Sequence, residues 1–518
     1  MRLRLFDILG IATVLMWLAW IGYAVTAPEE GLADVEQLEL TEEDRKNGWR
    51  DGIEWQGIYL KDQKVGYIKL KKWREGDKYH MDSDMVLHLT VMRTRQKIAT
   101  KTKAVLDKSM TLERFDLNIK SGPADMLMRG RVNGNEVTLE IDSGGDVQTQ
   151  KVTLKEPPRL NHSLKPLLLR GEMKEGDRTS MSFFDPGSMT ERRLVFTYKG
   201  REEIMIMEQV INAHVFTQEM DGIRMQVWLN DIGEVLQEDL PMGLQGVREA
   251  GVEARYGVVS GTVSPAEDVI DAVSVKPIGK VFPIASKRVK VRLKGLSFKG
   301  LKMDGGRQSW APAEDEQSGV LTMSIEALEG QDWTIGQLGD PSAAVPNDPE
   351  LAKELAASVK AEPMIQSDNE RIRSRTLRLL GAMPNETGPL KILDASRKIS
   401  KWVYDEVDKR SVIGVPSALE TLDNLQGDCN EHTTLAVAMM RSVGIPARPA
   451  VGIAYLPDRG RFFYHAWVEI WAGGWIAVDP TFGQFPADIG HVRFVTGGLS
   501  EQVEMFRVIG QLALEPLY

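Results

Sequence analysis

Cysteine is almost absent from this sequence. A single cysteine stands among 518 residues, so an internal disulfide is impossible, and so is any C-x-x-C or zinc-finger site. Positive charge is also scarce relative to negative charge, because the net charge is −10. Nucleic-acid binding needs a concentrated basic surface, so we expect no nucleic-acid partner. The spacing of an EF-hand calcium loop is missing as well. We therefore expect an activity that needs neither a metal nor a cofactor.

The one cysteine lies where a short helix is predicted to end and a longer helix to begin. Gly427 can supply a left-handed stop for the first helix. Asp428 is the expected N-cap of the second, and Glu431 completes the spacing of a capping box. Cys429 is therefore expected in the first turn, where the unpaired N–H groups of the helix favour the thiolate.

A predicted hairpin downstream carries a histidine and an aspartate. Residues 462–471 alternate as a strand, and residues 475–479 follow as its partner. If the loop has three residues centred on Gly473, His465 and Asp479 lie on one face, one diagonal apart, within reach of each other. A two-residue Gly-Gly turn would place them on opposite faces unless a bulge corrected the register. The interpretation therefore predicts an odd-length loop.

With that loop, Cys429, His465 and Asp479 have the types and order of a Cys-His-Asp triad. The cysteine is the expected nucleophile, the histidine the general base and the aspartate the group that orients the imidazole. Asp488 and His491 follow and could be two metal ligands. Without a third partner, we expect them to form a local hydrogen bond.

The runs GDCNEHTTLAVAMMRSVGIPARPAVG and HAWVEIWAGGWIAVDPTFG closely resemble the core of the transglutaminase-like superfamily, of the bacterial membrane-anchored type, within the papain-like thiol enzymes. The resemblance spans roughly residues 390–490 and implies the same three catalytic residues. It does not identify the oxyanion donor. Trp402 and Gln426 are the candidate side chains, and the backbone N–H of Cys429 could serve as well.

The N-terminus has a long run without charge. Residues 8–27 contain no charged side chain and follow Arg2 and Arg4, as expected for a transmembrane helix with its amino end in the cytoplasm. The alternative is a cleaved signal peptide ending at Val25-Thr26-Ala27. We favour the anchor. Either way, the bulk of the chain is expected outside the cytoplasm, on the periplasmic side of the inner membrane if the source is Gram-negative.

The predicted fold class is α+β, with an N-terminal transmembrane helix, a large antiparallel β-rich region and a C-terminal papain-like domain with a transglutaminase core. The anchor or signal segment occupies residues 1–27. Period-two patterns predict a β-rich domain over 28–257 and a second β unit over 258–338. Three prolines mark a linker at 339–349, before the domain that carries the cysteine, 350–518.

Two functions remain open at this point. The leading hypothesis is an exported thiol acyltransferase or amide hydrolase that forms an acyl-enzyme with a protein or peptide substrate. Release of the acyl group to an amine is transfer, and release to water is hydrolysis. The alternative is a non-catalytic envelope binding or assembly protein that works through its β-rich region.

Overall fold

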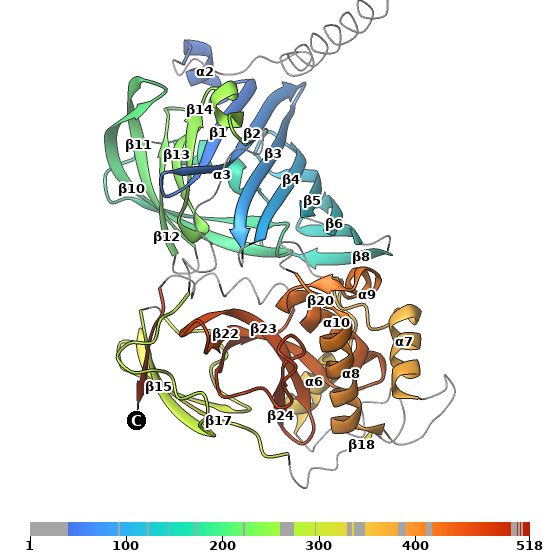
Figure 1. Ribbon diagram of the computed structural model, residues 1–518. Helices are drawn as coiled ribbons and strands as arrows, with labels where there is room; N and C mark the ends of the chain where they lie inside the picture. Colours follow the sequence, from blue (N-terminus) through green and yellow to red (C-terminus); the bar gives the residue numbers. More distant parts are fainter. Residues whose placement is uncertain are drawn as a thin grey trace, which may run out of the picture.

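The computed structural model describes residues 40–517, apart from 92–93, 122–123, 144–145, 170, 172, 221–222, 259–273, 296, 329–333, 336–347, 382–389, 411–416, 499–504, 506–507 and 509–510. Two units lie one above the other in Figure 1. The first consists of the blue to green strands, and the second of the yellow to red strands and helices.

The first unit is built on one 14-stranded antiparallel sheet, in the order β8-β7-β6-β5-β4-β3-β2-β1-β14-β13-β12-β11-β10-β9. Two meanders meet where the last strand pairs with the first, with Trp55 opposite Glu249. Tight turns join neighbours; the one between β6 and β7 has Gly134 at φ 60°, which suits a two-residue hairpin turn. The strands are β1 Gly52–Leu60, β2 Gln63–Glu75, β3 Lys78–Val91, β4 Thr94–Leu106, β5 Leu112–Ser121, β6 Ala124–Asn133, β7 Glu136–Ser143, β8 Asp146–Thr153, β9 Arg178–Asp185, β10 Thr190–Ile206, β11 Gln209–Met220, β12 Ile223–Leu229, β13 Val235–Leu240 and β14 Leu244–Glu249. The short helices of this unit are α2 Glu42–Asn47, α3 Asn161–Leu168, the 3-10 turn η1 Pro241–Gly243 and α4 Gly251–Arg255.

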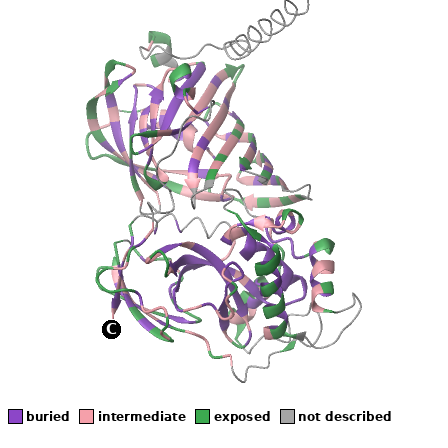
Figure 2. Cartoon of the chain, in the orientation of Figure 1, coloured by how far each residue is buried: buried purple, intermediate pink, exposed green. Residues whose placement is uncertain are grey.

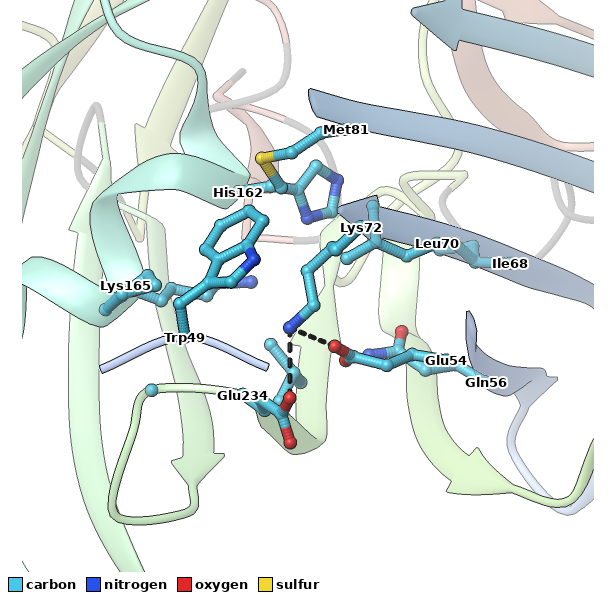
Figure 3. Close-up of a pocket in the computed structure, with 13 residues that line it drawn as sticks. Trp49, Glu54, Gln56, Ile68, Leu70, Lys72, Met81, His162, Lys165 and Glu234 are labelled. Atoms are coloured by element: carbon cyan, nitrogen blue, oxygen red, sulfur yellow. Dashed lines mark hydrogen bonds and ion pairs between the residues drawn. The ribbon is translucent and has the colours of Figure 1, made fainter. Parts of the chain in front are cut away.

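Charged side chains are buried between α3 and the strands of this sheet. Lys72 lies between Glu54 and Glu234, with 3.0 Å from Nζ to the Glu234 carboxylate (Figure 3). Lys165 of α3 donates to Glu238 at 2.6 Å. Buried ions are stable only when paired, as these are. The cavity beside them is about 30 Å³, room for about one water, so this unit has a paired polar interior and no pocket of ligand size at that place.

The second unit contains two four-stranded sheets. One has the order β16-β17-β15-β26, and its last strand comes from the C-terminal end of the described chain, with Leu293 opposite Leu514. Segments 258–338 and 350–518, predicted as separate units, thus contribute to one sheet. Its strands are β15 Arg288–Lys294, β16 Gln308–Pro312, β17 Ser318–Ser324 and β26 Ala513–Leu517, and a two-stranded pair joins β18 Thr334–Ile335 to β19 Leu390–Lys391.

The other sheet, in the order β24-β23-β22-β25, packs against helices. Helix α10 is buried along nearly its whole length, and its apolar residues share a core with Val468, Ile470 and Val478 of the sheet. Figure 2 shows this buried centre and the exposed outer surfaces of α7 and α8. The elements are α6 Pro349–Ala357, α7 Glu370–Leu380, α8 Ile392–Glu406, β20 Asp408–Lys409, α9 Ala418–Asn424, β21 Gln426–Gly427, α10 Cys429–Ser442, β22 Ala447–Leu456, β23 Arg461–Trp471, β24 Trp475–Val478 and β25 His491–Thr496.

The predicted fold class, α+β with an N-terminal transmembrane helix, is wrong. Strand predominates over helix in the described residues, with one large antiparallel sheet. Within those residues, no helix is both long and apolar enough to cross a membrane. The longest, α8, has 15 residues, about 22 Å against the ~30 Å of a hydrocarbon core. The run at 8–27, from which the span was predicted by composition alone, lies outside the described residues, as does most of the predicted linker at 339–349.

Candidate active site

The start of α10 places Cys429 as the first helical residue. Asp428 is the N-cap, and its own N–H donates to Glu431 Oε2 at 2.9 Å, which confirms the predicted capping box. The left-handed stop of the preceding helix is Leu425, at φ 48°, and not Gly427. A Cβ on Gly427 would lie 2.2 Å from Glu431 Cβ. The glycine is therefore explained by the close approach of the capping glutamate.

The hairpin has the predicted odd-length loop. Trp471 pairs with Trp475, and Val468 with Val478, so residues 472–474 form a three-residue loop. This register brings His465 and Asp479 to the same face, where Nε2 of the imidazole lies 2.8 Å from Oδ2 of the carboxylate.

The sulfur of Cys429 lies at an uncovered stretch of β23. The pairing of β24 begins at Val468, so the edge of β23 near Ala466 is not covered by β24. Cys429 packs with Ala466, the residue next to His465, and the backbone N–H of Ala466 lowers the pKa of the thiol. Since Nε2 of His465 donates to Asp479, Nδ1 is left as the ring nitrogen that can accept a proton. The structure therefore brings the helix end with the thiol to the strand that carries the imidazole.

Asp479 accepts hydrogen bonds at both oxygens and is fully buried. Oδ1 accepts from the N–H groups of Thr481 at 2.7 Å and Phe482 at 2.9 Å. Oδ2 lies between the Nε2 atoms of His465, at 2.8 Å, and His491, at 2.9 Å. Burial alone would raise the pKa of Asp479, but the charge and hydrogen bond of His465, with the hydrogen bond of His491, hold it well below its ordinary value. The carboxylate is therefore ionised.

The segment that carries these residues is similar to known proteins. Residues 382–480 match the model of the transglutaminase-like superfamily. This segment is similar to the transglutaminase-like core. An uncharacterized protein of Mycobacterium leprae is 33% identical over 93 residues, which covers 16% of this chain and 32% of that protein. The chain thus spans about a third of the length of this curated relative.

Two solved structures are similar to parts of the chain. A "Putative Cysteine Protease" of Cytophaga hutchinsonii is 15% identical, and the similarity covers 44% of this chain and 83% of that one, with a TM-score of 0.28. A β-barrel-like protein of a domain of unknown function from Brucella abortus is 8% identical, with coverage of 38% of this chain and 95% of that one, and a TM-score of 0.31.

The thiol of the transglutaminase-like core is less acidic than the sequence predicted. Burial raises the pKa of Cys429 well above its ordinary value, and the negative charge of Asp428 raises it further. The N–H of Ala466 opposes this shift, whereas Glu431 and Asp479 add to it. The helix end favours a thiolate, but burial of the sulfur and the adjacent Asp428 carboxylate favour the neutral thiol. The expectation of a resting thiolate is therefore corrected to a neutral thiol.

This neutral thiol leads to a prediction for chemical reactivity. At pH 7, iodoacetamide should alkylate folded Cys429 at least about tenfold more slowly than the same residue in the unfolded chain, because only the thiolate reacts. The rate should still be rising at about pH 9. The alkylation rate can be measured by intact-mass spectrometry over time, and the adduct can be assigned to Cys429 because it is the one cysteine in the sequence. The chain in denaturant is the matched control. A rate that levels off below pH 7 would instead show a preformed thiolate.

The candidate oxyanion donors lie in different places. Trp402 belongs to the apolar core of the helices, with the Arg375 guanidinium 4.5 Å from its ring centroid. Cys429 packs instead with residues of β22 and β23, so the described contacts do not bring the indole to the sulfur. Gln426 is partly exposed in β21, three residues before the cysteine. The backbone N–H of Cys429 also remains a candidate.

Sequence reasoning missed the contact between His491 and Asp479. It paired His491 with Asp488 alone, and that hydrogen bond is present at 3.0 Å. His465, Asp479 and His491 offer ligand atoms within 4.8 Å of one another, a set that could hold a metal ion. We interpret it as a hydrogen-bonded cluster, because one carboxylate oxygen already accepts from both imidazoles. Strand β25 reaches this place by pairing with β22 through an irregular register, a non-local contact that leaves no local pattern in the sequence.

Proposed function

We propose that this chain is a thiol enzyme that acts on an amide bond of a protein or peptide through an acyl-enzyme on Cys429. The observation that carries the proposal is the buried hydrogen bond of 2.8 Å between His465 and Asp479, beside the helix end that presents the sulfur. The match of residues 382–480 to the transglutaminase-like superfamily supports the same class of chemistry. Ordered in this way, the three side chains have the nucleophile, base and orienter arrangement.

The first half-reaction forms the acyl-enzyme. Nδ1 of His465 takes the thiol proton as the sulfur attacks the carbonyl carbon, and the carbonyl electrons move onto oxygen. When the oxyanion collapses, the C–N bond breaks and the amine leaves with the proton from His465. The buried charge of Asp479 stabilises the imidazolium between these steps. The product is a thioester on Cys429.

The second half-reaction releases the acyl group. Nδ1 of His465 takes a proton from an incoming amine or water, whose nitrogen or oxygen attacks the thioester carbonyl. The C–S bond then breaks, and the proton returns to the sulfur. An amine gives acyl transfer and water gives hydrolysis, so one arrangement serves both outcomes. Because the resting thiol is neutral, the base is required in the first step.

The proposal predicts a base-dependent adduct on one sulfur. Incubated with p-nitrophenyl acetate, the wild type should release one burst of p-nitrophenolate and gain one acetyl group at Cys429, measured by intact mass. C429A should show neither, and H465A should acylate about 10²- to 10⁴-fold more slowly. H80A, which removes a histidine of the β3 strand in the first unit, is the matched control and should behave as wild type.

Two results would count against the proposal. Equal acylation rates in the wild type and H465A would show that Cys429 reacts as an ordinary thiol, without a general base. If C429A also kept the cellular role while deletion of residues 40–340 removed it, the protein would be a non-catalytic binding or assembly protein that works through its β-rich region.

A further inference from the structure

The hydrogen bonds of His491 fix its protonation state. The side chain is 1% exposed, and its two ring nitrogens face two different carboxylates. Nε2 lies 2.9 Å from Asp479 Oδ2, and Nδ1 lies 3.0 Å from Asp488 Oδ1. A neutral imidazole has one N–H and one lone pair, whereas an ionised carboxylate only accepts. Both hydrogen bonds can form together only if both ring nitrogens carry a proton.

The second carboxylate is itself held in place. Asp488 Oδ2 accepts from the Gln484 side-chain amide at 2.8 Å, and Oδ1 accepts from the Gly490 N–H at 2.9 Å. The Arg307 side chain donates to the backbone oxygen of Asp488 at 2.5 Å and is paired with Glu326. The Arg307 side chain therefore holds the loop before β25 in place. In this position, Asp488 can accept a hydrogen bond from His491.

The imidazoles of His465 and His491 bind the same oxygen of Asp479, and each contacts a neighbouring aromatic ring. The ring of Phe482 stacks on His465, with centroids 4.3 Å apart and an interplanar angle of 10°. The ring of Trp467 meets His491 edge-on, with centroids 5.1 Å apart. Neither imidazole is thus free to turn away. His491 can hold the carboxylate even while His465 exchanges its proton with the thiol or the substrate.

We propose that His491 is a positioning residue of the triad, present as an imidazolium between Asp479 and Asp488, which keeps Asp479 ionised and directed at His465. This inference rests on the proposed function. Its positive charge also offsets the negative charges of Asp428 and Asp479, both of which raise the pKa of the Cys429 thiol. Without His491, the carboxylate that orients the catalytic base would lose one of its hydrogen bonds.

The charges that face His491 determine its pH dependence. They are Asp479 and Asp488, with the His465 imidazole beside them and the Arg307–Glu326 pair behind the loop. Burial alone would lower the pKa of His491, but its hydrogen bonds to the two carboxylates raise the pKa above the ordinary value. A raised pKa means that the charge is complete below about pH 6.5 and is lost as the pH rises through the raised value. The acylation rate should therefore have an alkaline limb that depends on Asp488.

The test compares pH profiles of Cys429 acylation by p-nitrophenyl acetate. H491Q can donate to Asp479 but has no charge, and it should lower the rate at least about tenfold, the effect of one pKa unit. D488N keeps an acceptor for Nδ1 and removes the negative charge, so it should move the alkaline limb to lower pH. D458N, in which the replaced side chain is 76% exposed, is the matched control and should reproduce the wild-type profile. Thermal unfolding verifies that each variant is folded; if H491Q is not, D488N alone decides.

A second measurement separates this inference from the proposed function. In nitrogen-15 spectra of histidine-labelled protein at pH 7, the resonances that H491Q removes should be those of a ring with two protonated nitrogens. One protonated nitrogen, or pH profiles of D488N and wild type that superimpose, would overturn the role of His491 even if Cys429 is acylated normally. Conversely, a doubly protonated His491 in a protein that is never acylated would disprove the proposed function and leave only the ionic arrangement.

Discussion

Replacing Asp479 by asparagine should lower the rate of Cys429 acylation by about 10⁴-fold, the scale seen when an orienting carboxylate becomes an amide. The asparagine amide would present N–H groups where Oδ2 now accepts from His465 at 2.8 Å and His491 at 2.9 Å. To avoid two donors facing each other, His465 must move its proton from Nε2 to Nδ1. The nitrogen that should take the thiol proton would then already carry one.

The same variant also tests the ionisation of this carboxylate. Asparagine retains an oxygen that can accept from the N–H groups of Thr481 and Phe482. The backbone of the loop that follows Asp479 can therefore keep its conformation. Because the folded pKa of Asp479 is depressed, its ionisation stabilises the protein above the ordinary pKa of about 4 and ceases to do so as the pH falls. The stability difference between wild type and D479N should therefore shrink on acidification. A D479N rate within tenfold of wild type would remove Asp479 from the proposed mechanism.

Local patterns were sufficient to predict how the candidate triad is assembled. The capping box at Asp428 and Glu431 depends on residues three apart, and the loop centred on Gly473 decides the register of its own hairpin. Both are short-range features, and both are confirmed. The acidity of the thiol could not be predicted in this way, because burial, which depends on the packing of distant elements, raises its pKa more than the adjacent Asp428 does.

Long-range pairing accounts for most of what the sequence did not predict. Strand β26 completes the sheet that begins at β15, more than two hundred residues earlier, and β25 brings His491 to Asp479 through its pairing with β22. Neither contact has a local signature. The curved β-rich region was evident from its period-two pattern, but the meeting of its first and last strands was not. Export of the chain stays a prediction.

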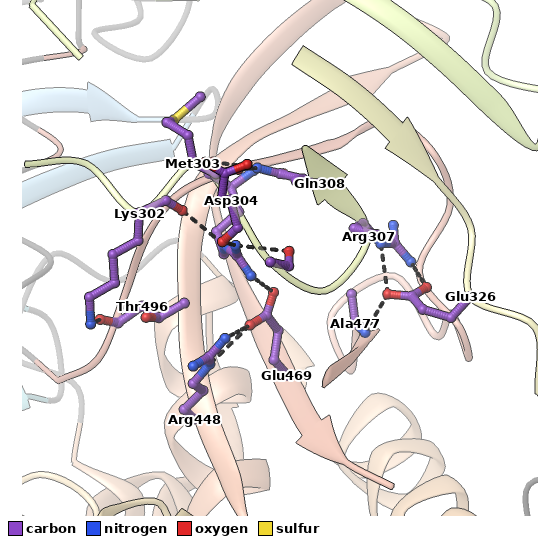
Figure 4. Close-up of polar contacts among 12 residues, drawn as sticks. Lys302, Met303, Asp304, Arg307, Gln308, Glu326, Arg448, Glu469, Ala477 and Thr496 are labelled. Atoms are coloured by element: carbon purple, nitrogen blue, oxygen red, sulfur yellow. Dashed lines mark hydrogen bonds and ion pairs between the residues drawn. The ribbon is translucent and has the colours of Figure 1, made fainter. Parts of the chain in front are cut away.

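A buried ion network joins the two sheets of the second unit. Glu469 of β23 accepts from Arg493 at 2.6 Å and from Arg448 at 2.7 Å (Figure 4). Arg493 also donates to the backbone oxygens of Lys302, at 3.2 Å, and Gly305, at 3.0 Å. One carboxylate thus pairs with two guanidinium groups and links β23, which carries the proposed base, to the loop that leads into β16. Removing one member of a buried ion network is strongly destabilising, because its partners are left as uncompensated buried charges.

E469A should therefore destabilise the second unit by about 3–5 kcal/mol, since Arg493, 2% exposed, and Arg448, 11% exposed, would be left without their buried counter-charge. For a domain of this size, that corresponds to a fall of about 10 °C in the midpoint of the affected calorimetric transition. E354A is the matched control, because Glu354 pairs with the same Arg448 but is 44% exposed, and an exposed pair contributes only about 0–1 kcal/mol. If the two variants lowered the midpoint equally, the two sheets would have to be held together by their apolar contacts, with the ion network contributing little.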